Sequence, residues 1–315
     1  MAVITLRTEP WGERARVELL GTPIDRVERH TLAARLHAFL VSGQPHQIVT
    51  ANLDFLAIAR RRDGFRHLLA NVDLVVCDGK PLQWAAALRG DALPARVTGS
   101  DILVETCQLS AAHGYRLFLL GAAPGVADRA ARALERLYPG VVIAGTYAPP
   151  VGAFDTAEDD AIVARVREAR ADALFVALGA PRQDEWIRDH LGALDVPLCV
   201  GVGGIFNFFA GETRRAPAWM QRCGMEWAFR LAQEPGRLWR RYLRDDLPVF
   251  LALIAEQAGR RLGVVVPRDA ARVETPWASG ADGGAGDGGA EVGDADAGDM
   301  NDREVEMAAS GHERG

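Results

Sequence analysis

The sequence predicts an α/β protein built on a Rossmann-like, doubly wound, mostly parallel sheet. Apolar runs of strand length alternate with amphipathic helical segments, and the apolar runs end in glycine or polar residues. Hydrophobicity that is continuous rather than alternating indicates strands buried on both faces, as in a parallel sheet. Regular alternation of such strands with helices favours a doubly wound α/β domain.

The elements can be placed from these patterns. The predicted strands of the sheet are 46–52, 73–79, 115–121, 140–145, 171–179 and 196–204. Helical segments between them, such as 100–114 and 124–140, end at glycines suited to a helix C-terminus. Before the sheet we expect a small hairpin, formed by 3–7 and 15–21, and an amphipathic helix at 28–41.

These patterns divide the chain into a Rossmann-like α/β core at 1–211, a helical appendage rich in Arg and Trp at 212–265, and a tail at 266–315. The whole chain has a net charge of −6, but from Arg268 onward four Arg stand against twelve Asp and Glu. The acidity therefore belongs to the tail, and we expect no nucleic-acid partner. Because the tail is rich in Gly and poor in large apolar side chains, it is predicted to be disordered.

Cysteine and histidine patterns give no sign of a metal site. The four cysteines form no CxxC pair, and the seven histidines form no HxxxH motif. We expect reduced packing cysteines and neither metal nor cofactor. No apolar stretch reaches the roughly 18 residues needed to cross a bilayer. The N-terminus also lacks the pattern of a signal peptide, so a cytoplasmic protein is expected.

Asp78 is the first candidate for chemistry, because ligands of open parallel sheets bind outside the carboxyl ends of the strands. It follows an apolar strand and precedes Gly79. One interpretation makes it the N-cap of a helix that starts near Pro81. The other makes it a general base, partly desolvated in a cleft. The sequence leaves both open.

Glycine-rich turns are the second kind of candidate. The turn from Gly121 to Gly125 opens a helix, which suits phosphate binding by backbone amides. It is not a GxGxxG motif, and no acid ends the following strand, which counts against a dinucleotide-binding oxidoreductase. The glycines of 201–211 indicate either a crowded turn or close approach of a ligand. In GAPRQDEW, helix-start preferences explain Pro181 and the acids but not Gln183.

Eight colinear motifs carry a resemblance to a known family. They are VTANLDF, DLVVCDGKPLQWA, LPARVTGSDI, FLLGAAPGVA, LGAPRQDEW, GVGGIFNFFAG, RRAPAWMQRCGMEW and RLAQEPGRLWRRYL. In this order and spacing they resemble the WecG/TagA/CpsF glycosyltransferases, known as glycosyltransferase family 26. The resemblance covers roughly residues 15–255.

The resemblance implies an inverting, metal-independent transferase that moves a sugar, often N-acetylmannosamine, from UDP to an undecaprenyl-diphosphate-linked acceptor. By motif, Asp78 matches the catalytic base, and the pocket positions are Thr50, Asn52, Arg96 and Gln183. Backbone amides and arginines would compensate the diphosphate. The remaining predicted substrate-binding residues are Gly121, Gly125, Gly179, Gly203, Gly204, Asn207, Arg214 and Arg215.

An acceptor held in the membrane implies that the protein reaches the inner face of the cytoplasmic membrane. Segment 225–262 interleaves Trp, Tyr and Phe with arginines, which suits a helix lying on an anionic surface. Alternatively, its apolar side chains face the core. A homo-oligomer is compatible with the sequence, as is an inactive membrane-associated scaffold, although intact site residues count against the scaffold.

Overall fold

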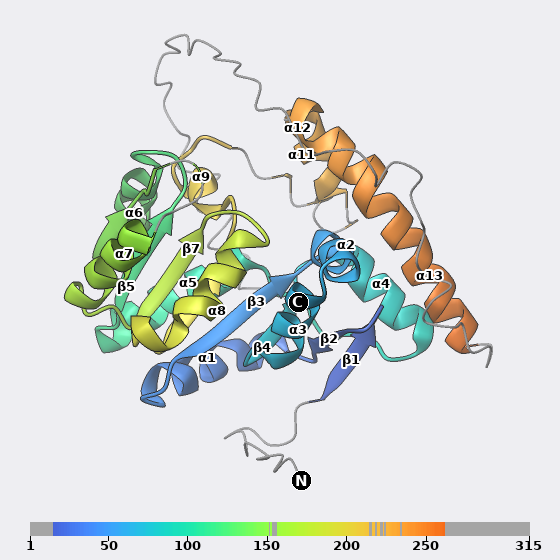
Figure 1. The fold of residues 1–315 in the computed structure, drawn as a ribbon, viewed down its shortest axis with the longest axis horizontal. Coiled ribbons are helices and arrows are strands. Elements are labelled where there is room, and N and C mark those ends of the chain that lie inside the picture. Colours follow the sequence, from blue (N-terminus) through green and yellow to red (C-terminus); the bar gives the residue numbers. More distant parts are fainter. Residues whose placement is uncertain are drawn as a thin grey trace. The chain divides into compact units, whose positions relative to one another are not determined.

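The computed structural model describes residues 15–150, 152, 156–213, 216–217, 219–220, 223, 225–233 and 235–261. The strand predicted at 3–7, the tail at 266–315, and both Arg214 and Arg215 lie outside these residues. The main sheet has six strands in the order β4-β3-β8-β7-β5-β6, and every neighbouring pair is parallel (Figure 1). The predicted Rossmann-like α/β fold is confirmed.

The strands of this sheet are β3 His46–Ala51, β4 Leu74–Cys77, β5 Arg116–Gly121, β6 Val142–Tyr147, β7 Ala173–Ala177 and β8 Leu198–Gly201. All but β6 lie inside the predicted apolar runs, and β6 starts and ends slightly later than its run. The residues of β4, β7 and β8 are all buried. Burial on both faces explains why their hydrophobicity is continuous rather than alternating.

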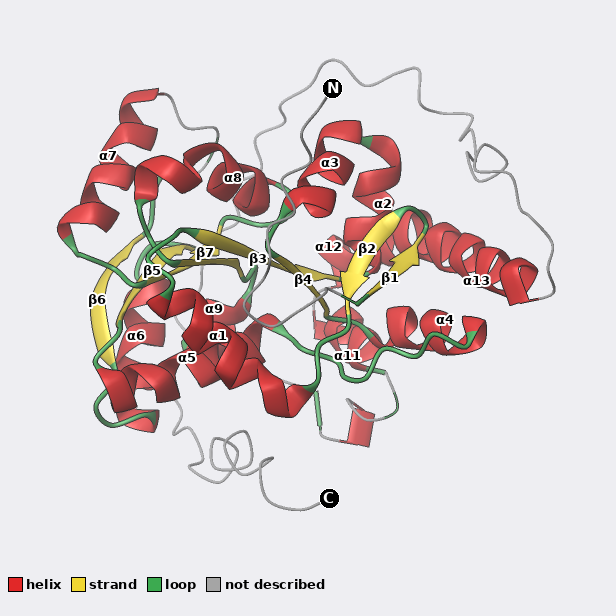
Figure 2. Cartoon of the chain, turned by 90° about the horizontal axis from the view of Figure 1, so that it is seen from below, coloured by secondary structure: helices red, strands yellow, loops and turns green. Residues whose placement is uncertain are grey.

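Helices cover both faces of the sheet, as Figure 2 shows. One face packs against α1 Leu32–Val41, α5 Gly99–His113, α6 Val126–Leu137 and α9 Ile205–Phe209. The other face packs against α2 Leu53–Arg61, α3 Asp63–Asn71 and α4 Lys80–Arg89 beside β3 and β4. Farther along this second face lie α7 Thr156–Glu168 and α8 Arg182–Leu194.

The N-terminal hairpin differs from its prediction. Its strands are β1 Arg16–Leu19 and β2 Thr22–Asp25, which pair antiparallel through Leu20 and Gly21. Both turn residues have positive φ, at 50° and 76°, as a tight two-residue hairpin turn requires. β2 was not predicted, and 3–7, the predicted partner of 15–21, lies outside the described residues. Pro23 makes β2 hard to recognise from the sequence, because proline within a strand is confined mainly to edge strands.

A short 3₁₀ turn, η1 Arg29–Thr31, leads into α1, so the helix predicted at 28–41 is confirmed from residue 32 onward. The C-terminal segment contains α11 Glu226–Gln233, α12 Pro235–Arg240, the π-helix η2 Arg241–Asp246 and α13 Leu247–Arg261. The helical character predicted for 212–265 is confirmed for the described residues between Glu226 and Arg261, whereas 212–213 and 216–217 are not helical. None of the described helices is long and apolar enough to cross a membrane.

The C-terminal helices are attached to the core by apolar contacts and ion pairs. Val249 and Leu253 of α13 are buried in the same cluster as α2 and α4. Arg241 pairs with Asp54 of α2 at 3.0 Å, and Arg61 of α2 pairs with Asp245 at 2.8 Å. The appendage predicted from composition thus shares a hydrophobic core with the first half of the sheet.

Candidate active site

The topology marks one place on the sheet as a ligand site. β3 and β8 are neighbours, yet the chain leaves β3 into α2 on one face and leaves β8 into α9 on the other. In open α/β sheets, ligands bind at such a point, outside the carboxyl ends of the strands. The hydroxyl of Thr50 donates to the carbonyl of Gly201 across this point, at 3.4 Å. Thr50 is buried there, so it joins the two strands instead of facing solvent.

Asp78 lies at this edge, directly after β4. Its backbone N–H donates to the carbonyl of Ala51 at 2.8 Å, which holds it beside the end of β3. The side chain is half-buried. The N-cap of α4 is Gly79, and no side chain caps the helix. The capping interpretation of Asp78 is therefore wrong, and its carboxyl group is available for chemistry.

The environment of Asp78 brings its titration close to neutral pH. Burial is the largest influence and raises the pKa of the carboxyl group to about 7. The positive charge of Arg96 opposes this rise, whereas the negative charges of Glu226 and Asp101 add to it. Arg230 has a smaller lowering effect. A carboxyl group with a pKa near the working pH is well suited to act as a general base.

Asn52 lies next to Asp78 and begins α2. Its side-chain oxygen accepts hydrogen bonds from the N–H groups of Asp54, at 3.0 Å, and Phe55, at 3.4 Å. A Cβ on Gly79 would lie 3.7 Å from the Cβ of Asn52, so the two strand ends are in close contact. The cap uses only the oxygen of the amide. We infer that its nitrogen, still able to donate, faces the site.

Arg96 reaches the site from the loop between α4 and α5. The following residue, Val97, donates its N–H to the carbonyl of Cys77 at 2.9 Å, which fixes this loop against the end of β4. Nη1 of Arg96 lies 2.9 Å from Oε2 of Glu226, the first residue of α11. Sequence reasoning missed Glu226, because nothing local shows that a residue so far along the chain pairs with Arg96.

Gln183 has a supporting role. Its side chain is 2% exposed, and its Oε1 accepts the N–H of Gly203 at 3.0 Å. The expectation that Gln183 contacts donor or acceptor does not match this burial, because packing of α8 against β8 covers the side chain. Its hydrogen bond to Gly203 holds the loop after β8. Sequence reasoning also missed Asp184, which is fully buried beside Gln183 and whose pKa burial raises to about 7.

Three glycines at or just after the strand ends have conformations that only glycine adopts easily. Gly121 has φ of 105°, and a Cβ there would lie 2.6 Å from the carbonyl oxygen of Ala177. Gly125 caps α6 with φ of 79°, and Gly179 has the same φ. Gly121 is therefore crowded against the end of β7. The turn still presents the first amides of α6 at the carboxyl edge.

The loop after β8 continues toward α6. Gly203 has φ of 56°, and Gly204 is the N-cap of α9. In α9, Asn207 donates its amide N–H to Glu212 at 2.8 Å, and Glu212 also pairs with Arg129 of α6. The structure thus places Asn207 beside the start of α6, in a polar group distinct from the one around Asp78.

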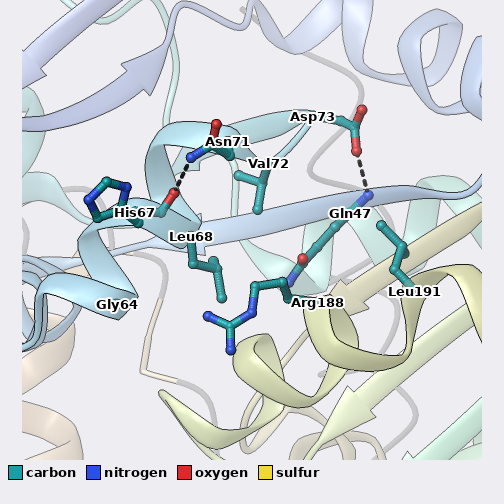
Figure 3. Close-up of a pocket in the computed structure, with 9 residues that line it drawn as sticks. All are labelled: Gln47, Gly64, His67, Leu68, Asn71, Val72, Asp73, Arg188 and Leu191. Carbon is teal, nitrogen blue, oxygen red and sulfur yellow. Dashed lines mark hydrogen bonds between the residues drawn. The ribbon is translucent and has the colours of Figure 1, made fainter.

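A pocket drawn in Figure 3 lies at the opposite end of the strands. It is lined by Gln47, Gly64, His67, Leu68, Asn71, Val72, Asp73, Arg188 and Leu191. Gln47 and Asp73 stand at the amino ends of β3 and β4, where the N–H of Gln47 donates to Asp73 at 2.9 Å. None of the predicted site residues lines it. Since parallel sheets place their ligands at the other edge, we assign the active site to the surroundings of Asp78.

Metal-ligating side chains are not grouped in the part of the chain that the structure describes: no three His, Cys, Asp or Glu could hold an ion together. Cys77, Cys107 and Cys199 are free and buried, and burial raises the pKa of the Cys77 and Cys107 thiols to about 12. These thiols are packing groups, as predicted, because the reactive thiolate form is disfavoured.

Fold and site together define a Rossmann-like α/β enzyme with a carboxyl group that titrates near neutral pH at the carboxyl edge of its sheet. The chain belongs to the WecG/TagA/CpsF family of glycosyl transferases, whose model matches residues 17–263. It is therefore a glycosyltransferase. Its relatives include the N-acetylglucosaminyldiphosphoundecaprenol N-acetyl-beta-D-mannosaminyltransferases of Staphylococcus aureus strains MW2 and NCTC 8325. Each is 28% identical over 254 residues, which cover 80% of this chain and 96% of the relative.

Proposed function

We propose that this glycosyltransferase moves an N-acetylmannosamine-like hexose from a UDP-sugar to an N-acetylglucosamine unit on a polyprenyl diphosphate, in the synthesis of a surface polysaccharide. The relatives from S. aureus carry that donor sugar and acceptor in their names. The observation that carries the mechanism is Asp78, which follows β4 at the carboxyl edge of the sheet, beside the end of β3, and whose carboxyl group has a pKa near 7.

The proposed reaction inverts the configuration at the transferred carbon. The carboxylate of Asp78 takes the proton of the acceptor hydroxyl as that oxygen bonds to the anomeric carbon. The bond from this carbon to the β-phosphate breaks on the opposite face, and its electron pair leaves with UDP. One carboxylate is sufficient, because the leaving diphosphate has low basicity and needs charge compensation more than protonation.

The other site residues divide into binding and supporting groups. Asn52 and Arg96, both partly exposed beside Asp78, are proposed to contact the substrates. Thr50 and Gln183 hold the ends of β3 and β8 in place, as their burial and hydrogen bonds support.

The diphosphate is assigned to amides and arginines. The first amides of α6, after Gly125, and the side chains of Arg214 and Arg215 are proposed to bind it without a metal ion.

A donor screen tests the proposal. The purified protein is incubated with a panel of UDP-hexoses and UDP-N-acetylhexosamines and a short-chain prenyl-diphosphate N-acetylglucosamine acceptor, and UDP release is measured. We expect an N-acetylated UDP-hexose to give acceptor-dependent release. Release that ignores the acceptor, or no release with any donor, would contradict the proposed reaction.

We also propose that the C-terminal helices bind an anionic membrane surface. Trp239, Leu243, Leu247 and Leu251 recur every four residues along α12, η2 and α13, and their exposed fractions are 48%, 56%, 44% and 60%. The alternative that such side chains face the core is wrong for these four. The guanidinium of Arg240 lies over the Trp239 ring at 5.5 Å, which combines a cation with an apolar surface. This mixture suits a helix lying in the headgroup layer.

Vesicle sedimentation tests this surface. Changing Leu243, Leu247 and Leu251 together to Ser should release the protein from anionic vesicles. Val41→Ser, which removes an exposed apolar side chain elsewhere on the core, should not. The triple variant should also lose turnover on long-chain acceptors while retaining it on short-chain ones. Unchanged sedimentation of the triple variant would overturn the membrane assignment.

A further inference from the structure

An ion pair joins two parts of the chain that are distant in sequence, at the side of the candidate base. Arg96 in the loop after α4 and Glu226 at the start of α11 lie 2.9 Å apart, with 19% and 29% of their side chains exposed. Such partial burial makes the pair less screened than one fully in solvent. Arg96 is bonded to Glu226 and is also within electrostatic range of Asp78, so one cation acts on two carboxylates.

Among the described residues, the other charged groups around Asp78 do not displace the pairing of Arg96 with Glu226. Asp101 of α5 is bound by Arg29 at 2.7 Å and by the hydroxyl of Thr98 at 2.8 Å. Arg230 stands one turn after Glu226 on α11 and is exposed. Lys80 begins α4 and acts on the neighbouring thiol of Cys77.

We propose that Glu226 is a positioning residue for sugar transfer: it binds Arg96, keeps this cation from pairing with Asp78, and so leaves Asp78 available as the base. The proposal rests on the function proposed above for Asp78. It also gives α11 a role in the chemistry, because docking of this helix brings Glu226 to the site.

Electrostatics gives the direction of the effect. Arg96 lowers the pKa of Asp78, and Glu226 raises it. Without Glu226, the guanidinium of Arg96 would be free to pair with the carboxylate of Asp78. An opposite charge that comes within about 4 to 6 Å of a carboxyl group lowers its pKa by about 1 to 3 units. A carboxylate with a lower pKa is a weaker base, so the rate at high pH should fall as well.

The pH dependence of kcat/KM separates this role from a structural one. In Glu226→Gln the acid limb should move down by about one unit, and in Arg96→Gln it should move up by a similar amount. A merely structural ion pair gives no reason for opposite shifts when either partner is changed. Asp245→Asn is the matched control, because it breaks an ion pair of 2.8 Å between the core and the C-terminal helices away from Asp78. Its acid limb should stay in place.

Two results would overturn the inference. If Glu226→Gln is folded, as judged by its melting temperature, and its acid limb matches that of the wild type, Glu226 does not act on the base. If both partners shift the limb in the same direction, the pair is structural. Asp78→Asn run beside them distinguishes the two proposals. Activity retained in Asp78→Asn contradicts the base assignment and this inference together, whereas an inactive Asp78→Asn with an unmoved limb in Glu226→Gln contradicts this inference alone.

Discussion

Asp184 should make the stability of the folded protein fall as the pH rises. Its side chain is 0% exposed, and its Oδ1 would lie 2.5 Å from a Cβ on Gly201. Among the described residues, neither carboxylate oxygen has a hydrogen-bond partner of normal geometry, and the amide of Gln183 is the polar group beside it. Burial raises the pKa of Asp184 from 3.8 to about 7. The change to test is Asp184→Asn, which keeps the shape and removes the ionisation.

The sign and size of the effect follow from linkage. Because the pKa of Asp184 is higher in the folded than in the unfolded chain, its contribution to stability is complete below about pH 4 and is lost as the pH rises toward 7. Each unit of pKa difference corresponds to about 1.4 kcal/mol, so roughly 4 kcal/mol separates the two ends of this range. The stability of Asp184→Asn relative to the wild type should therefore increase by about 1.4 kcal/mol per pH unit between pH 4 and 7.

Urea unfolding at pH 5, 6, 7 and 8 measures this difference. Comparing variant with wild type at each pH cancels the other buried acids, such as Asp246, whose pKa is also raised to about 7. Asp189→Asn, on the same helix but 54% exposed, is the matched control and should give a difference that does not change with pH. A constant difference for Asp184→Asn as well would refute the reasoning, because it would mean that Asp184 stays ionised or stays protonated throughout.

Three further predictions concern the site. Gly201→Ala should lower the free energy of unfolding by about 1 to 3 kcal/mol, since its Cβ would lie 2.7 Å from Nε2 of Gln183. Thermal unfolding measures this, with Gly192→Ala on α8 as the control, because nothing lies within 4 Å of a Cβ there. Asn52→Ala should lose about 1 kcal/mol of stability, because it removes the cap of α2. Asn52→Ser should keep the cap and the stability but raise KM, which would show that the amide nitrogen binds substrate. An equal KM in Asn52→Ser and the wild type would leave capping as the role of Asn52. EDTA should leave turnover unchanged, and activity that EDTA removes and Mg²⁺ or Mn²⁺ restores would contradict the metal-independent proposal.

Much of the fold could be predicted because its strands are buried on both faces and therefore read as continuous apolar runs. The location of Asp78 followed from the same pattern, since a polar residue directly after such a strand lies at the carboxyl edge of the sheet. The hairpin was harder, because β2 contains Pro23 and begins immediately after the turn at Leu20 and Gly21.

The residues that were missed, or that have another role than predicted, depend on tertiary contacts. Gln183 reads as a polar residue at a strand end, but packing of α8 against Gly201 buries it. Glu226 lies 130 residues from its partner Arg96, so no local pattern connects them. Asp184 could be understood as a favourable acid in the first turn of α8, and only the tertiary structure shows that its carboxyl group is desolvated.

The central claim is that Asp78 is the base of sugar transfer. The measurement that tests it most directly is single-turnover transfer by Asp78→Asn at saturating UDP-sugar and acceptor, with UDP affinity measured on the same sample. We predict a rate about 10²- to 10⁴-fold below that of the wild type, with UDP affinity and melting temperature nearly unchanged. A rate within a few-fold of the wild type, from a folded variant that binds UDP, would show that the proton leaves the acceptor by another route.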